Sequence, residues 1–199
     1  MFRTKSFATV LIGAALAAMP AFSQEFNRSE VSVQAFGSFV KTTTQDGVQQ
    51  SATNSGGVLA NYRFFFTKNQ GIEANYGYSV NTQNYGLASG PLGIKSNQHE
   101  FSAAYVLRHK MHGITPFVEA GAAGLVFDPR DLAGVSTQTR AALVYGGGAD
   151  FDLAAHFFLR AEYRGLVTRV PTFNIPNGLT TTNKWYNIYE PTIGVAYHF

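Results

Sequence analysis

The 199-residue chain contains no cysteine and few charged residues, and both shortages restrict the class of protein to which it can belong. Without cysteine, neither a disulfide framework nor a thiolate metal site can form. Charged residues make up 14% of the chain, well below the roughly 25% of ordinary soluble domains. After residue 23, no apolar run approaches the ~20 residues that a transmembrane helix needs. Aromatic residues, in contrast, reach 14%, with 17 Phe and 10 Tyr, and glycine contributes 20 residues.

The N-terminal segment, residues 1–23, has the organisation of a secretory signal peptide. Arg3 and Lys5 precede an uncharged stretch over residues 7–19, and Ala21 and Ser23 supply the small residues of a cleavage site. Its removal leaves residues 24–199, with 13 basic and 12 acidic residues. Because the mature chain is nearly neutral, the pI of about 9.2 does not indicate a nucleic-acid partner.

An exported chain that crosses a bilayer without helices must be a closed β-barrel, because every backbone N–H and C=O needs a partner there. The required alternation of apolar and polar residues is clearest where Ile72 and Tyr76 interleave with Glu73 and Asn75. We therefore predict an all-β fold, an eight-stranded antiparallel transmembrane up-and-down β-barrel, as one domain over residues 24–199. Its predicted strands are residues 29–40, 57–66, 71–81, 98–108, 115–126, 139–151, 157–170 and 186–199.

The connections between these segments alternate in length. Short connections are predicted at residues 67–70, 109–114 and 152–156, and long polar ones at residues 41–55, 82–97, 127–138 and 171–185. In outer-membrane barrels the short turns face the periplasm and the long loops face the outside. With eight strands, both termini are then expected on the periplasmic side of the bacterial outer membrane.

The last predicted strand ends in an aromatic residue, which is unusual because chain termini commonly fray in water. Thr192, Gly194, Tyr197 and Phe199 resemble the C-terminal assembly signal of outer-membrane barrels. This resemblance implies that the barrel-assembly machinery contacts the segment during insertion.

Two further segments carry a family resemblance. Residues 145–165, YGGGADFDLAAHFFLRAEYRG, resemble the sixth and seventh strands of the OmpA-like outer-membrane β-barrel family, and residues 71–79, GIEANYGYS, resemble its third strand. The resemblance covers the mature chain and implies architecture rather than an activity. No peptidoglycan-binding domain follows the barrel segment, so stand-alone OmpX-like barrels are the nearer comparison and a cell-wall tether is not implied.

The faces predicted to point into the lumen carry charges of both signs. An isolated buried charge is strongly disfavoured, so we expect these groups to pair and close an interior that is only wide enough for side chains. A gated or leaky conduction path is the alternative. The predicted structural ion network consists of Arg63, Glu73, Glu100, Glu119, Arg140, Arg160, Glu162, Arg164 and Glu190, in which Glu73, Glu119, Glu162 and Glu190 are expected to pair with Arg63, Arg140 and Arg160.

Some small outer-membrane barrels are lipid-modifying enzymes, which need a nucleophile and a base within reach. None of the histidines has a serine two residues away, and two turn histidines without carboxylates make a poor metal site. We therefore predict no enzymatic activity, no catalytic or metal site and no cofactor. The histidines are His99, His109, His112, His156 and His198.

Three functions remain open from the sequence. The first is a structural or surface-exposed barrel whose long loops have an adhesion or antigen role, and the second is a small passive-diffusion channel. A lipid-modifying enzyme is the third and least supported. The predicted partners are outer-membrane lipids and the assembly machinery, and the polar loops contain no motif that identifies an extracellular ligand.

Replacing Phe199 with Ser tests the assembly signal. We expect the variant to reach the outer membrane in much smaller amounts than the wild type, because the machinery reads the terminal aromatic residue. Quantifying folded barrel in outer-membrane fractions measures the loss. Normal insertion of the variant contradicts the prediction.

Overall fold

In a computed structural model, the structure describes residues 28–40, 43–45, 48–87, 90–130, 136–171, 174–175, 178–179 and 185–199. The predicted signal peptide, residues 1–23, lies outside the described residues, as do parts of the long connections. In the described part of the chain, no helix has the length and apolar character required to cross a membrane.

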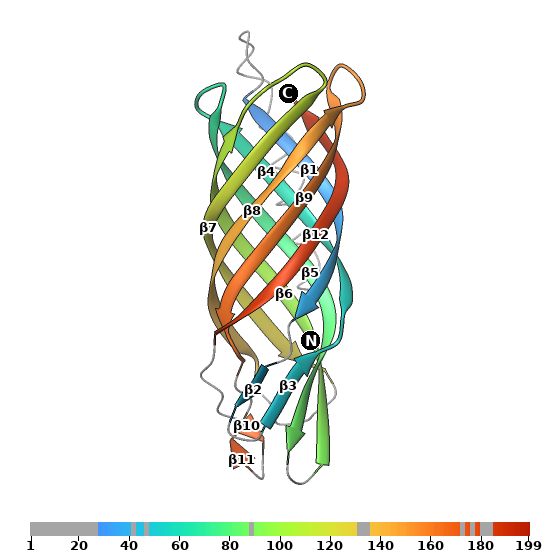
Figure 1. The fold of residues 1–199 in the computed structure, drawn as a ribbon, viewed down its shortest axis with the longest axis vertical. Coiled ribbons are helices and arrows are strands. Elements are labelled where there is room, and N and C mark those ends of the chain that lie inside the picture. Colours follow the sequence, from blue (N-terminus) through green and yellow to red (C-terminus); the bar gives the residue numbers. More distant parts are fainter. Residues whose placement is uncertain are drawn as a thin grey trace, which may run out of the picture.

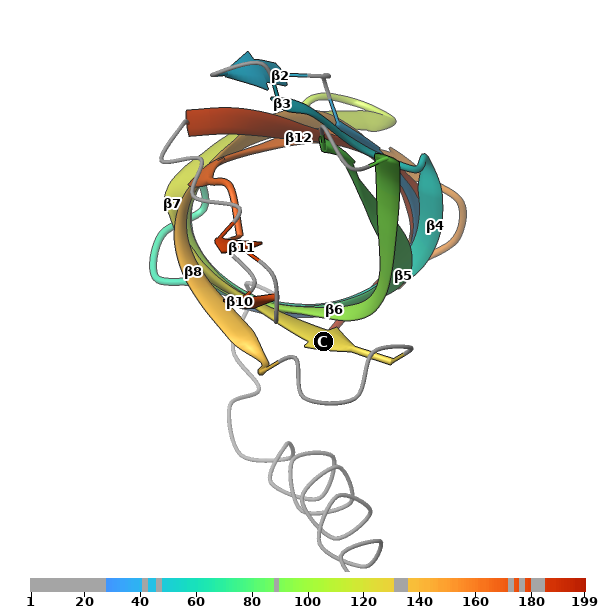
Figure 2. The same ribbon diagram turned by 90° about the horizontal axis from the view of Figure 1, so that it is seen from below.

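Eight strands form a closed antiparallel barrel (Figures 1 and 2). Each strand pairs with its neighbour in the chain, and β1 pairs with β12 to close the ring. The predicted fold class is therefore confirmed. The barrel strands are β1 (Ser29–Val40), β4 (Ser55–Phe65), β5 (Gln70–Leu87), β6 (Gly90–Arg108), β7 (Ile114–Pro129), β8 (Gln138–Asp152), β9 (Phe157–Arg169) and β12 (Trp185–His198).

The two ends of the barrel differ. Short connections at residues 66–69, 109–113 and 153–156 lie at one end, which we call the turn end. β1 begins and β12 finishes there, at the upper end in Figure 1, where the backbones of Ser29 and Phe199 hydrogen-bond to each other. The opposite, loop end carries two small hairpins. These are β2 (Thr43–Gln45) with β3 (Val48–Ala52), and β10 (Asn174–Ile175) with β11 (Gly178–Leu179).

One segment that was predicted as a loop extends two barrel strands, β5 and β6, instead. Residues 82–97 were expected to form an irregular connection, but β5 and β6 remain paired as far as Leu87 and Gly90, and β3 pairs alongside β5. The prediction was wrong because it required an apolar face to identify a strand. Ile94 and Ser96 are buried while Gly93 and Lys95 are exposed, so the alternation continues, but the outward residues are no longer apolar where the strands extend beyond the lipid.

The alternation of exposed and buried residues along the barrel strands matches the predicted faces. On β5, Ile72 is 55% and Tyr76 is 40% exposed, whereas Glu73 and Asn75 are 2% and 6% exposed. The same parity places Val33, Val58, Phe101, Val118, Leu143, Ile193 and Val195 outside. The outer surface is thus apolar and the polar side chains face the lumen, as the bilayer requires.

Aromatic side chains lie on the outer surface near the turn end. Phe157 packs on Tyr197 with ring centroids 5.0 Å apart, Tyr197 stacks on Phe199 at 6.1 Å, and Phe66 meets Tyr105 at 6.0 Å. Such aromatic residues characterise the membrane–water interfaces of outer-membrane barrels.

Two substitutions at neighbouring positions of β5 test which of its faces meets the lipid. Tyr76→Arg places a charge toward lipid and should cost about 2–4 kcal/mol near the bilayer midplane. Asn75→Arg points into a lumen rich in carboxylates and should cost less. Equilibrium unfolding of both variants in lipid vesicles gives the comparison, and equal losses contradict the assigned faces.

Candidate functional site

The barrel interior is the candidate site, because the inward faces of all eight strands converge there. Toward the loop end, an apolar layer occupies part of the interior, beside buried polar residues such as Asn81 and Gln98. This apolar layer consists of Ile94, Ala123, Leu125, Phe127, Ala142, Val144, Leu166, Val170, Tyr186 and Ile188, all buried. This layer was not predicted, because the residues predicted to fill the lumen were charged ones alone. The apolar inward positions of β6–β9 and β12 were the available signal.

Arg164 on β9 is the centre of the mid-barrel charges. Its guanidinium is fully buried, and its Nη2 donates to Glu100 Oε1 at 2.7 Å and to Ser102 Oγ at 3.1 Å. Nε donates to Glu119 Oε1 at 3.3 Å, and Nη1 donates to Glu190 Oε2 at 3.4 Å. One arginine therefore joins carboxylates from β6, β7 and β12.

Arg63 on β4 contacts a second set of carboxylates. Its Nε donates to Glu73, and its Nη2 lies 3.7 Å from Glu119 Oε2 and 3.8 Å from Glu162 Oε2. The guanidinium carbon lies 4.0 Å from the centroid of the Phe117 ring. Its Nη1 also lies 4.0 Å from Asp150 Oδ2, so Arg63 is held by one hydrogen-bonded ion pair, three longer ionic contacts and an aromatic face.

Arg160 lies nearer the turn end and is also fully buried. It makes a two-pronged contact with Asp150, with Nε–Oδ1 2.7 Å and Nη2–Oδ2 2.9 Å. Its Nη2 also donates to Glu30 Oε2 at 2.8 Å, and its Nη1 donates to Asn61 Oδ1 at 3.1 Å. The parallel hydrogen bonds to Asp150 are the geometry in which arginine binds carboxylates most strongly.

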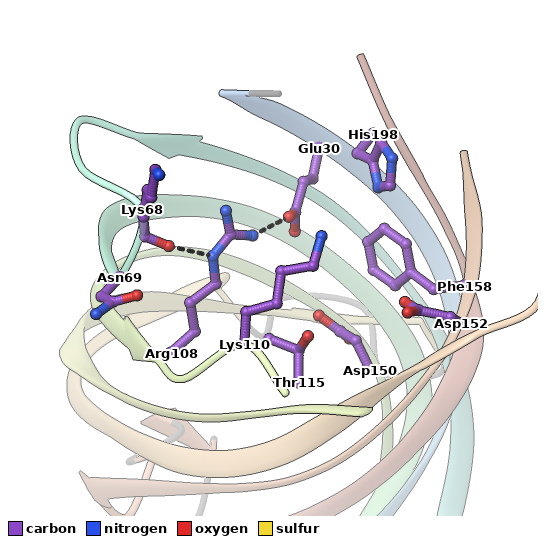
Figure 3. A pocket seen from close by; sticks show the side chains of 10 residues that line it. All are labelled: Glu30, Lys68, Asn69, Arg108, Lys110, Thr115, Asp150, Asp152, Phe158 and His198. Carbon is purple, nitrogen blue, oxygen red and sulfur yellow. Dashed lines mark hydrogen bonds and ion pairs between the residues drawn. The ribbon is translucent and has the colours of Figure 1, made fainter. Parts of the chain in front are cut away.

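A cavity of about 460 Å³ opens inside the turn end (Figure 3). Arg108 forms part of its wall, pairs with Glu30 and donates from Nε to the carbonyl oxygen of Lys68 at 3.0 Å. Lys110, Asp150 and Asp152 also line this vestibule. The charge network therefore begins at the floor of a solvent-open vestibule and extends to the apolar layer.

Asp150 links Arg160 to Arg63, and through this link the structure brings together Arg63, Glu73, Glu100, Glu119, Arg160, Glu162, Arg164 and Glu190. Arg140 lies apart, with its Nε 3.4 Å from the carbonyl oxygen of Val170. Arg160 contacts Glu30 and Asp150 instead of the four glutamates expected as partners. Three network residues were not predicted: Glu30, Arg108 and Asp150. Each of the three occupies an inward-facing position in the two-residue alternation of its strand, β1, β6 or β8, and this position could have identified it.

The predicted assembly-signal residues lie on or directly after β12. Thr192 Oγ1 donates to Gln34 Oε1 at 2.7 Å across the seam between β12 and β1, the pair of strands that closes the barrel. At Gly194, a Cβ atom would collide with the carbonyl oxygen of Val33 on β1. Tyr197 stacks on Phe199. Packing therefore requires glycine at position 194, independently of any assembly signal, since only glycine lets β12 approach β1 this closely.

A closed antiparallel ring with an apolar exterior and a charged, side-chain-filled interior defines the class, an eight-stranded transmembrane β-barrel. The family model of the outer membrane protein beta-barrel domain matches residues 8–199. The chain belongs to this family, and its fold is that of the OmpA- and OmpX-like outer-membrane barrels. No curated protein sequence matches the chain at a significant level.

Solved structures share this architecture. OprG from Pseudomonas aeruginosa matches with a TM-score of 0.68 at 13% identity, covering 89% of this chain and 98% of OprG. Neisserial surface protein A matches with a TM-score of 0.59 at 14% identity, covering 86% and 97%. Ail of Yersinia pestis, in complex with the heparin analogue sucrose octasulfate, matches with a TM-score of 0.54 at 17% identity, covering 87% and 99%. These similarities show the fold alone.

The network geometry predicts unequal effects for two arginines. Arg164→Met leaves several buried carboxylates without their cation and should destabilise the barrel by about 3–5 kcal/mol. Arg140→Met removes one 3.4 Å contact to a carbonyl oxygen and should cost far less. Urea unfolding in vesicles measures both. Similar midpoints for the two variants contradict the network as a source of stability.

Proposed function

We propose that this outer-membrane β-barrel protein is a structural, surface-exposed barrel whose lumen is closed by its own side chains. In this proposal a signal peptide directs export, both termini are periplasmic and the loop end faces the outside. The barrel contacts outer-membrane lipids and serves a structural rather than a catalytic role. An adhesion or antigen role belongs to the long loops.

The observation that carries the closed lumen is the filling of the interior by two consecutive layers. Arg63, Arg160 and Arg164 are among the largest fully buried side chains, and they bridge carboxylates across the lumen. Beyond them, Phe127 and Leu125 belong to the apolar layer and are 0% exposed. An eight-stranded barrel is only wide enough for such filling, so two barriers lie in series.

The extracellular role is supported by the shape of the loop end. β5 and β6 continue as a paired hairpin to Leu87 and Gly90, and β3 extends the same sheet. A hydrogen-bonded hairpin presents surface residues at a defined position, as a recognition element requires.

A passive-diffusion channel is the second candidate, and the vestibule favours it. The 460 Å³ cavity reaches from the turn end to Asp150, so part of the lumen is open. Under this alternative, the ion network is the gate rather than a permanent plug.

Single-channel recording in planar bilayers separates the two functions. The refolded wild type should show little conductance, because both layers obstruct the lumen. Arg164→Ala and Phe127→Ala should each leave one layer intact and conduct little, whereas the double variant should conduct clearly more.

Steady, large conductance of the wild type overturns the closed lumen and favours the channel. High conductance in Arg164→Ala alone shows that the apolar layer is no barrier. Phe101→Ala is the matched control, because Phe101 lies outside at 55% exposure and its truncation should leave conductance unchanged.

A further inference from the structure

The mid-barrel charges do not balance. At the turn side, the carboxylates of Glu30 and Asp150 face the guanidiniums of Arg160 and Arg108. At mid-barrel, among the described residues, five buried carboxylates face only Arg63 and Arg164. These carboxylates are Glu73, Glu100, Glu119, Glu162 and Glu190. Excess negative charge in a low-dielectric interior is neutralised either by protons or by a bound cation.

Three of these carboxylates meet across the lumen. Glu73 on β5, Glu119 on β7 and Glu162 on β9 place one oxygen each within 4.8 Å of the others. The wall between the last two is formed by glycines of β8, because Gly146 pairs with Glu119 and Gly148 pairs with Glu162. A Cβ at Gly146 would stand 3.1 Å from Glu119 Oε1. The missing side chains leave the space in which the carboxylates approach one another.

Glu162 is an unusual member of this cluster. Its side chain is 0% exposed, and neither carboxylate oxygen accepts a hydrogen bond. Its nearest cationic nitrogens are Arg63 Nη2 at 3.8 Å, itself without a hydrogen-bond partner, and Arg164 Nε at 3.9 Å, both beyond hydrogen-bond distance. Glu119 Oε2 is likewise without a hydrogen bond. Buried acceptors of this kind carry a large desolvation cost unless a further group binds them.

We propose that Glu73, Glu119 and Glu162 bind a divalent cation of the calcium type in the middle of the lumen. Calcium takes oxygen ligands at about 2.3–2.6 Å in flexible geometry, so ligands on opposite sides of the ion lie up to about 5 Å apart. The spacing within 4.8 Å accommodates it, whereas magnesium at about 2.1 Å requires a tighter cage. Arg63 stays on Glu73 and Phe117, and the ion ties β5, β7 and β9 together.

The test uses the full mature barrel, refolded in calcium chloride or in chelator because the closed lumen hinders later loading. After gel filtration into metal-free buffer, elemental analysis should find about one calcium ion per calcium-refolded barrel. Chelator-refolded protein should unfold at a lower denaturant concentration, since a ligand that binds only the folded state stabilises it.

Glu162→Gln keeps the side-chain shape and removes the charge. It should lower bound calcium at least about tenfold and abolish the difference between the two refolding conditions. Asp152→Asn is the control, because Asp152 is an exposed carboxylate of the vestibule outside the cluster. It should retain calcium like the wild type. If Glu162→Gln does not fold, Glu119→Gln takes its place.

Wild-type barrel that holds no calcium and unfolds identically in both conditions overturns the site, because protons then neutralise the carboxylates. Equal calcium in the wild type and the glutamine variant also overturns it, because the ion then binds elsewhere. Low conductance of the wild type can persist in either case, so the closed lumen and the cation site fail independently.

Discussion

Closure of the backbone hydrogen-bond ladder is the constraint on which the rest of this structure depends. In lipid, an unpaired strand edge is prohibitively costly, so β1 must pair with β12. Gly194 permits the close approach at this seam, and Thr192 bonds across it to Gln34. The apolar exterior and polar interior then follow from the two-residue period of each strand. Closure by eight strands also fixes a narrow lumen that side chains must fill.

Two kinds of side-chain packing fill that lumen, one ion-paired and one apolar. Arginines bridge carboxylates from different strands where the sequence places charges inward, and aliphatic and aromatic side chains pack where it does not. The first solution demands nearly complete pairing, because each unpaired buried charge is costly. Mid-barrel, five carboxylates share two arginines, and Glu162 has ionic contacts but no hydrogen bond. That imbalance is the basis for the cation site, while the apolar layer needs no counter-charge.

Sequence periodicity predicted the barrel strands and their faces because the bilayer imposes one rule on every strand. It missed the continuation of β5 and β6, where outward positions such as Lys95 are polar instead of apolar. The alternation of residues along each strand placed residues such as Arg63 and Glu162 inside, but it could not identify their ion-pair partners. Pairing depends on strand register, so Arg160 reaches Asp150 and Glu30, and Arg140 lies too near the loop end to join the network.

The proposed function depends on closure of the lumen by side chains on the loop-end side of the vestibule. The absence of native cysteine allows a direct measurement with single cysteines and a small charged thiol reagent. Asp152→Cys, in the vestibule, should react rapidly in the folded barrel. Ser102→Cys, buried beside Arg164, should remain unlabelled until the barrel is unfolded. Equal labelling rates at the two positions would show an open lumen and contradict the account.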